Sequence, residues 1–195
     1  MRYDAEHKRK TRQKVLTAAA KAIRAEGPHR IGVAGIMSEA GLTHGGFYAH
    51  FASKDDLVAE AIDAMFVDAG ARFARETEGK GPAEGLAAYI DFYLSHAHRD
   101  ARGSGCPIPA LSADLPRLEA GAQARFGRGV AGMTGRVAAM LTALGHDDAA
   151  DLAASLVAEL VGAVALSRAV ADPEQSDAIL ARSRRAARRR IGLDA

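Results

Sequence analysis

The residues that could do chemistry near the N-terminus are small or hydrogen-bonding groups at the start of a short helical pattern. They are Thr43, His44, Gly45 and Gly46. Thr43 and His44 lie where the second helix of a helix-turn-helix meets base edges in the DNA major groove. Gly45 and Gly46 are poor helix formers, and their benefit would be a close approach of the helix backbone to the groove. Thr43 could instead serve only as the N-cap of this helix, and His44 could pack against the protein.

The pattern around this segment is that of two short helices joined by a tight turn. Apolar residues recur at the spacing of one helix face over residues 33–40, and Gly41 follows in a position typical of a helix end. A second helix is expected over 44–50, with Phe47 and Phe51 packed against a longer first helix. Two short helices joined in this way present one helix to the DNA major groove.

Cys106 is the candidate for covalent chemistry, because it is the one cysteine of the chain. It follows Gly105 and precedes a helical turn that we predict near 108–113. A helix N-terminus lowers the pKa of a thiol and favours the reactive thiolate, and Arg99 or Arg102 could lower it further. Such a thiolate can be alkylated or reversibly oxidised. A lone cysteine can also be a buried small hydrophobe, and this alternative stays open.

Enzyme chemistry finds little support in the sequence. A nucleophilic pair with Cys106 would need His96 or His98, and these two histidines would point to different sides of a helix. The same spacing argues against a helical metal pair, and one cysteine cannot form a thiolate zinc site. The glycines of residues 127–132 match the letters of a dinucleotide fingerprint but lack the preceding strand. We therefore predict a protein that is not an enzyme and that has no metal or cofactor.

Composition and charge agree with an all-α protein that binds a polyanion at one end. The chain has 195 residues, of which 48% are hydrophobic. Residues 1–54 carry ten basic and four acidic side chains, whereas residues 55–181 carry ten and nineteen. A basic head on an acidic body is typical of a nucleic-acid-binding protein. The absence of a run of 18 apolar residues, of a signal peptide and of paired cysteines predicts a cytoplasmic protein with no membrane partner.

Helical periodicity divides the chain into elements that would position these residues. We predict a first helix from about Lys8 to Glu26, and a long helix from about Lys54, opened by a capping box at Ser53 and ended near 79–82. Residues 101–117 are predicted to form an irregular connection. Further helices are expected around 86–97, from after Pro116 to about Leu144, over 152–171, and from the Asp172-Pro173 cap to about Arg190.

The stretch 31–57 closely resembles the DNA-binding domain of the TetR/AcrR family of bacterial transcriptional regulators. The resemblance covers roughly the first 65 residues, and the remainder agrees in length, helical character and a basic last helix. It implies a three-helix helix-turn-helix head over 1–54 and a helical ligand-binding and dimerisation body over 55–195, with the helix from about 54 shared. It rests on Ile36, Glu39-Ala40-Gly41, Thr43, Phe47-Tyr48-Ala49-His50-Phe51 and Lys54-Asp55-Asp56-Leu57.

The resemblance also implies roles for single residues of the head. Tyr48 and His50 match positions that contact the DNA backbone, and Lys54 matches a phosphate-contacting lysine. Such contacts position a protein without reading sequence. The basic side chains within residues 8–14 (Lys8, Arg9, Lys10, Arg12 and Lys14) could supplement them, or could form a solvated tail.

For the body, the resemblance implies a homodimer and a ligand. The last two helices of family members pair in a four-helix bundle, which here would use about 148–171 and 174–191; the first of these could also be simply monomer core. Two heads would then read a palindromic operator. A pocket for a small molecule could be lined by large side chains, each of which could equally be core: Tyr89, Phe92, Tyr93, Phe126 and Met133.

These expectations combine into one functional hypothesis. The segment around Cys106 resembles a subgroup whose members respond to electrophiles or oxidants through this cysteine. We therefore expect a DNA-binding transcriptional regulator, more specifically a repressor, released by a small molecule or by modification of Cys106. The alternatives are a dimeric helical adaptor without specific DNA binding and a thiol-dependent enzyme.

Overall fold

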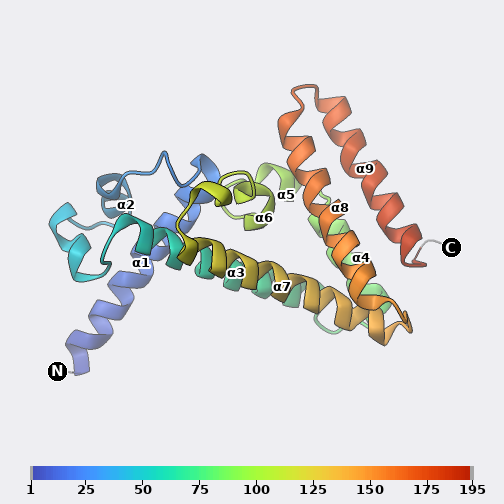
Figure 1. The fold of residues 1–195 in the computed structure, drawn as a ribbon, viewed down its shortest axis with the longest axis horizontal. Coiled ribbons are helices and arrows are strands. Elements are labelled where there is room, and N and C mark those ends of the chain that lie inside the picture. The colour runs from blue at the N-terminus through green and yellow to red at the C-terminus, as the bar shows by residue number, and fades with distance from the viewer. Residues whose placement is uncertain (1, 194–195) are drawn as a thin grey trace.

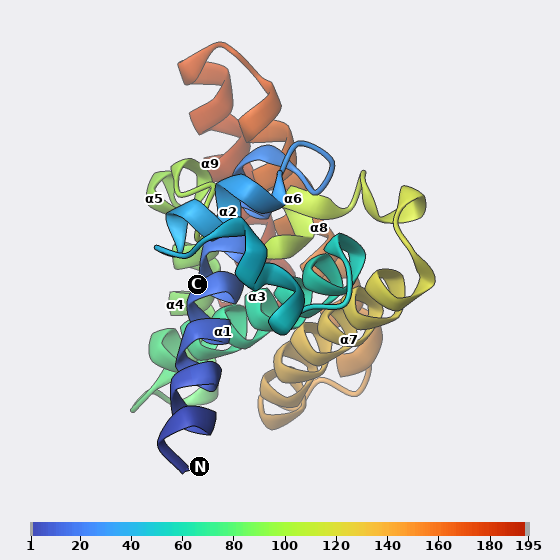
Figure 2. The same ribbon diagram turned by 90° about the vertical axis from the view of Figure 1, so that its left-hand side faces the viewer.

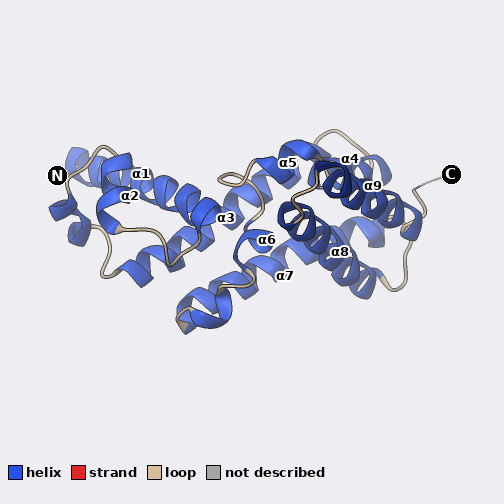
Figure 3. Ribbon diagram, turned by 90° about the horizontal axis from the view of Figure 1, so that it is seen from above, coloured by secondary structure: helices blue, strands red, loops and turns tan. Residues whose placement is uncertain are grey.

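The computed structural model describes residues 2–193, and every regular element in this range is a helix (Figure 3). The predicted all-α fold is therefore confirmed over these residues. Met1, Asp194 and Ala195, at the outer ends of the two predicted domains, lie outside them. In chain order the elements are α1 (Arg2–Glu26), α2 (Val33–Glu39), the 3-10 helix η1 (His44–Ala49), α3 (Lys54–Thr77), α4 (Pro82–Tyr93), α5 (His96–Asp100), α6 (Pro107–Leu111), the 3-10 helix η2 (Leu115–Arg117), α7 (Ala120–Ala143), α8 (Ala149–Ala169) and α9 (Pro173–Arg190).

The helices form a small head and a larger body that share α3 (Figure 1). Helices α1 and α2 and the segment η1 gather around the first turns of α3, and Figure 2 views the molecule from this end. Helices α3 and α7 run side by side along the molecule, and α8 and α9 form an antiparallel hairpin at the far end from the head. The segment predicted to bind DNA and the C-terminal hairpin therefore lie at opposite ends.

Two clusters of buried side chains correspond to the head and the body. Helix α3 contributes Leu57 and Met65 to the head cluster and Phe73 to the body cluster. Phe66 and Phe126 pack against both clusters and meet edge-on, with ring centroids 5.5 Å apart. Because a packed core transmits displacement rather than absorbing it, a change in the body can reach the head through α3.

Helix ends follow the predicted signals at several boundaries. At the start of α3, Ser53 Oγ accepts a hydrogen bond from Asp56 N–H at 3.0 Å. At the start of α9, Asp172 Oδ1 accepts from the N–H groups of Glu174 and Gln175. Gly41 ends the first helix of the helix-turn-helix with a φ of +74°, a conformation that favours glycine. These local predictions are confirmed.

Other boundaries differ from the prediction. Helix α1 begins at Arg2 rather than near Lys8. The single helix expected around 86–97 is wrong, because the chain breaks after Tyr93 and Ser95 caps a new helix by accepting from His98 N–H at 3.1 Å. Within the connection over 101–117, α6 confirms the helical turn predicted near 108–113, whereas η2 was not predicted.

Helix α8 is long and apolar enough to cross a membrane by length and composition alone. A helix buried in a protein core passes the same test, and α8 packs between α7 and α9 with Leu156 and Leu160 fully buried. The search for an uninterrupted run of 18 apolar residues in the sequence did not identify this helix, because polar residues interrupt it. Part of its apolar surface stays uncovered, because Leu166 is 60% exposed.

Candidate DNA interface and ligand pocket

The recognition segment of the head is a 3-10 helix, η1, rather than the α-helix predicted over 44–50. Two glycines within six residues explain this, since glycine stabilises an α-helix poorly. Phe47 anchors the segment: its side chain is buried and its ring stacks on that of Phe51, with centroids 5.6 Å apart. The core role predicted for both rings is confirmed. Tyr48, next to Phe47, is 73% exposed, so its phenol is available to a partner.

The N-terminus of the recognition segment is open to solvent. Thr43 is exposed and is the N-cap residue of η1, as the alternative predicted, but its side chain makes no capping hydrogen bond to the described residues. Its backbone carbonyl instead accepts from Gly46 N–H at 3.1 Å, the bond that opens a 3-10 helix. His44 and Gly45 are exposed beside it. These residues lie together on one outer surface, where DNA could reach them.

His50 and Lys54 lie on the two sides of the loop that joins η1 to α3. Both are half-buried. Burial is the largest cause that lowers the pKa of His50, and the positive charges of Lys8 and Arg12 add to it. His50 is therefore mainly neutral at pH 7 in the free protein. Lys54 is the first residue of α3, so its ammonium group belongs to the same end of the head as the recognition segment.

Arg12 stabilises the head from within, which corrects its assignment to a phosphate-binding cluster. Its Nε donates to the carbonyl of His50 at 3.3 Å, and its guanidinium lies over the Phe51 ring at 4.7 Å from the centroid. It also forms an ion pair with Glu60 of α3. The signal that could have found this role is position: Arg12 is on the same face of α1 as the buried Val15 and lies one turn before it.

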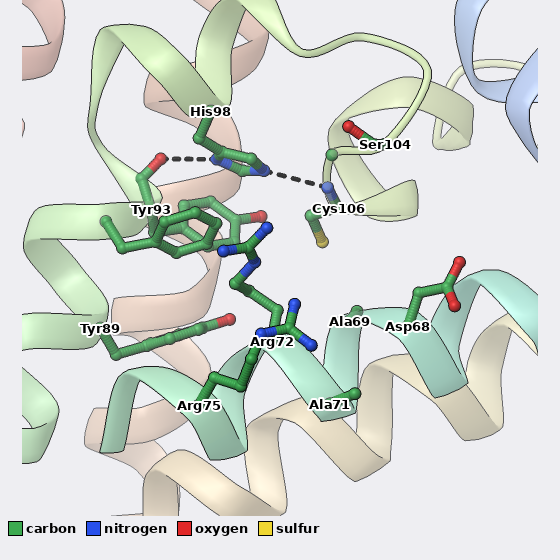
Figure 4. Close-up of a pocket in the computed structure, with 12 residues that line it drawn as sticks. Asp68, Ala69, Ala71, Arg72, Arg75, Tyr89, Tyr93, His98, Ser104 and Cys106 are labelled. Carbon is green, nitrogen blue, oxygen red and sulfur yellow. Dashed lines mark hydrogen bonds between the residues drawn. The ribbon is translucent and has the colours of Figure 1, made fainter. Parts of the chain in front are cut away.

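A cavity of about 230 Å³ lies in the body, between α3, α4 and the chain that leads into α6 (Figure 4). Tyr89, Phe92 and Tyr93 line it as predicted. Phe126 and Met133 do not: they belong to α7, where Phe126 meets Phe66 and Met133 is buried in the body core. The rest of the lining was not predicted, apart from Cys106, and comes from α3 and from 98–106: Asp68, Ala69, Ala71, Arg72, Arg75, His98, Ser104 and Gly105.

The Cys106 thiol is buried, and burial raises its pKa, which is the opposite of the prediction. The neighbouring Tyr93 side chain, the Ile108 N–H and the charges of Arg24 and Arg168 act in the other direction and are outweighed. Helix α6 has five residues, so its dipole is too short to offset the cost of a buried thiolate. The thiol is therefore protonated at neutral pH, as a buried small hydrophobe would be.

The arginines expected to activate Cys106 serve other contacts. Arg99 donates to Asp100 at 2.7 Å and to Asp177 of α9 at 2.6 Å. These two carboxylates, with Asp100 the larger cause, raise the pKa of Arg99. Arg102 is exposed. Arg99 therefore joins α5 to α9, and its place near Cys106 in the sequence does not make it a partner of the thiol.

His98 holds the backbone of Cys106, which the sequence did not reveal. Its Nδ1 lies 2.7 Å from the Tyr93 carbonyl oxygen, and its Nε2 accepts from the Cys106 N–H at 3.0 Å (Figure 4). A carbonyl only accepts and an amide N–H only donates, so the imidazole is neutral and carries its proton on Nδ1. Burial lowers its pKa to about 4. Because His98 binds the amide and not the thiol, it does not form a nucleophilic pair with Cys106.

Arg24 of α1 connects the head to the rim of this cavity. Its guanidinium is buried and donates to the Met65 carbonyl at 3.2 Å, to Asp68 Oδ2 at 2.9 Å and to the Gly103 carbonyl at 3.5 Å. Asp68 also lines the cavity, and Gly103 is three residues before Cys106. A single side chain of the head thus contacts Asp68 of the cavity lining and Gly103, the residue before the lining residue Ser104. The sequence could have indicated the buried position of Arg24, because this arginine directly follows the buried Ile23 at the end of the apolar face of α1.

Two family models match the two parts of the chain. The model of bacterial regulatory proteins of the tetR family matches residues 15–61. The model of the C-terminal domain of LmrA/YxaF-like transcriptional regulators matches residues 82–181, which is half of the chain. The chain belongs to the TetR family. It is a DNA-binding transcriptional regulator with a helix-turn-helix head and a helical C-terminal domain, and the family is one of regulators rather than enzymes, as predicted.

Individual relatives agree with this assignment. An uncharacterised HTH-type transcriptional regulator of Mycobacterium tuberculosis, Rv0196, is 29% identical over 104 residues, which are 53% of this chain and 52% of that protein. The chain thus spans about half the length of this curated relative. A TetR regulator from Chloroflexus aurantiacus J-10-FL is 25% identical with a TM-score of 0.79, over 93% of this chain and 94% of that one. The reduced form of E. coli NemR has the same fold: TM-score 0.82, 18% identity, 95% and 100% coverage.

Proposed function

We propose that this TetR-family regulator is a homodimeric repressor that leaves its operator when a small molecule enters the cavity beside Cys106. The observation that carries the proposal is the contact of Arg24 with both Asp68 and Gly103. Asp68 lines the cavity, Gly103 directly precedes the lining residue Ser104, and Arg24 belongs to α1 of the head. A ligand that moves either of them changes a contact that holds α1 in place.

The head would bind DNA with the exposed side of η1. Thr43 and His44 would meet base edges, and Gly45 and Gly46 would let the backbone approach the groove. Tyr48, His50 and Lys54 would donate to phosphates. Phosphate contacts make binding strongly salt-dependent, with log affinity falling by about 0.9 per log salt for each phosphate neutralised. A DNA partner would place the protein in the cytoplasm.

The dimer would form through α8 and α9, within the surfaces 148–171 and 174–191. Support comes from α8, which is apolar around much of its circumference while only part of it is covered by the rest of the chain. Leu166, exposed near the end of this helix, is the kind of side chain that a partner copy would bury. Two heads held by this interface would read a palindrome, with a spacing set by the dimer.

Ligand binding would act on the distance between the two heads. Asp68 and Gly103 hold the Arg24 guanidinium from α3 and from the chain before α6. Displacement of either one would free α1 to move relative to the body, and in a dimer this changes the spacing of the recognition segments. Allosteric coupling is typically about 1–3 kcal/mol, so we expect release to be a shift in affinity of about 5- to 150-fold.

The experiment is a fluorescence-anisotropy titration of the purified protein against the DNA upstream of its own gene, at two salt concentrations. Specific binding that weakens as the salt concentration rises would support the proposal that the protein is a regulator whose operator lies in this DNA. The Arg24→Met variant should bind the same DNA but lose part of its response to inducer, whereas Arg128→Gln, an exposed change on α7, should leave both unchanged. A folded protein that binds no DNA specifically would favour the dimeric adaptor.

Modification of Cys106 is a second route to release, supported by the position of its side chain at the cavity wall. Because the thiol is buried and protonated, only a reagent small enough to enter the cavity should react, and slowly. N-ethylmaleimide would form a thioether with the sulfur and occupy the cavity permanently. Release by this reagent that persists in a Cys106→Ser variant would exclude the cysteine as the sensor.

A further inference from the structure

We propose that the cavity binds a small aromatic monocarboxylate, with its carboxylate held by Arg72 and Arg75. The inference rests on the proposed ligand-responsive function and names the chemical class of the ligand. Both guanidinium groups point from α3 into the space between α4 and the segment that carries Cys106 (Figure 4). Guanidinium groups bind carboxylates through paired, charge-assisted hydrogen bonds.

The charged side chains of α3 at the cavity, Asp68, Arg72 and Arg75, lie on its open side, and their ion pairs leave one positive charge without a protein partner among the described residues. Arg24 pairs with Asp68 at 2.9 Å, and Arg72 lies 3.4 Å from Glu76. Arg75 forms no ion pair with any of the described residues. His98 does not add a charge, because it is neutral, so the lining selects for a ligand with a single negative charge.

The size and the walls of the cavity favour a single planar ring. About 230 Å³ is less than the roughly 300–1,000 Å³ of pockets for drug-sized ligands. The rings of Tyr89, Phe92 and Tyr93 form a continuous aromatic wall, with centroids 5.8 Å apart for Tyr89 and Tyr93 and 6.4 Å for Tyr89 and Phe92. Aromatic groups pack favourably against such walls in offset or edge-on arrangements.

A buried hydrogen-bond donor lies at the aromatic wall of the cavity. The Tyr93 side chain is 1% exposed, and its hydroxyl interacts with the Cys106 thiol, which is a weak acceptor. Burial raises the pKa of this phenol well above its usual value, so the hydroxyl keeps its proton. An oxygen of the ligand would be a stronger acceptor for this hydroxyl than the thiol is.

Arg72 is held ready for this contact. Its guanidinium lies over the ring of Phe92, 4.8 Å from the centroid. A carboxylate attached to a ring that packs on the same aromatic wall would therefore lie near this guanidinium.

The test is isothermal titration calorimetry on the full chain with benzoate and its neutral counterpart benzamide. We expect benzoate to bind with a Kd tighter than about 1 mM, and benzamide to bind at least about tenfold more weakly because it lacks the charge. Arg75→Gln should weaken benzoate binding about tenfold and remove the preference over benzamide. Tyr93→Phe should weaken it by a smaller factor and leave the preference in place. Arg128→Gln, outside the cavity, is the matched control.

Three results would overturn this ligand class: no benzoate binding by the folded wild type, equal affinity for benzamide, or unchanged affinity in Arg75→Gln. Unfolding midpoints of all variants establish that they are folded. The operator titration separates this inference from the proposed function. If benzoate binds but does not weaken operator binding, the proposed release of DNA by a ligand is contradicted, and the proposed ligand class is retained. If only a neutral compound releases the operator DNA, the proposed ligand class is contradicted, and the proposal of a ligand-responsive regulator is retained.

Discussion

In the head the aromatic side chains of Phe47 and Phe51 are buried while the polar groups of Thr43, His44 and Tyr48 face solvent. In the body aromatic side chains are buried too, but polar groups are buried with them, among them His98, Ser167 and Ser176. Ser176 Oγ, for example, donates to the Ser167 carbonyl at 2.7 Å and joins α8 to α9. A surface that binds DNA needs free donors on the outside, whereas a cavity that responds to a small molecule needs donors held in place inside the protein.

The two regions also differ in how far apart their contacts lie in the sequence. Phe47 and Phe51 belong to one short segment, and Ser53 caps α3 three residues before its partner. The contact of Arg24 with Gly103 spans 79 positions. These contacts of the recognition segment and of the α3 cap can therefore form locally, whereas the contacts of Arg12 in the head and of Arg24 beside the cavity depend on the tertiary fold.

The largest expected effect is the difference in stability between variants at a buried and at an exposed aromatic residue of the head. Phe47→Ala should lower the free energy of unfolding by about 3–5 kcal/mol, because it removes a buried ring. Tyr48→Ala should change it by less than about 0.5 kcal/mol and should still weaken operator binding. Urea unfolding and anisotropy titrations of both variants provide the measurement. Equal losses of stability would contradict the division of roles along this segment.

A pair of glycines on one helix tests the packing of the body. A Cβ at Gly129 of α7 would overlap the Phe66 ring, whereas a Cβ at Gly127 would meet nothing within 4 Å. Gly129→Ala should therefore cost about 1–3 kcal/mol of stability, and Gly127→Ala should add up to about 1 kcal/mol through helix propensity. Thermal and urea unfolding would compare the two. If both changes stabilise the protein, α7 is not closely packed against Phe66 of α3 at Gly129.

The buried histidine makes the stability of the body depend on pH. The pKa of His98 falls from 6.5 to about 4 on folding, so between these values the unfolded chain binds a proton that the folded chain excludes. This contribution is complete above pH 6.5 and is lost as the pH falls towards 4. Between pH 7.5 and 5 we expect a loss of about 2 kcal/mol.

His98→Asn should remove most of this pH dependence, although the variant will be less stable at neutral pH. Urea unfolding at several pH values gives both quantities. The head offers a comparison, since the half-buried His50 can approach solvent more easily. If the loss below pH 6.5 persists in His98→Asn and disappears in His50→Asn, the pH sensitivity belongs to the head.

The smallest expected effect concerns a single phosphate contact of the head. Lys54→Gln should reduce the slope of log operator affinity against log salt by about 0.9 and weaken binding at every sequence alike. Lys80→Gln, a lysine of the body whose Nζ donates to the Glu76 carbonyl, should leave the slope unchanged. Anisotropy titrations at several salt concentrations would show whether the phosphate contacts are confined to the head.

Sequence reasoning succeeded where a signal and its result lie within a few residues. The capping serine before α3, the turn at Gly41 and the buried Phe47 are such cases. It failed for Phe126 and Met133, because the large side chains of α7 face other helices rather than the cavity. It also missed Arg72 and Arg75, since a charged residue on a helix gives no sign of whether it points to solvent or into a cavity.

By itself, the sequence determined the long helices, the caps of α3 and α9 and the turn at Gly41, because backbone hydrogen bonding and side-chain periodicity act over a few residues. Only the tertiary structure decided the state of Cys106. Its place before a helix predicted a reactive thiolate, but burial keeps it protonated. The physical reason is that the solvation of a charge depends on everything packed around it. The same holds for Arg24, whose role exists only because α1, α3 and the chain before α6 meet at one point.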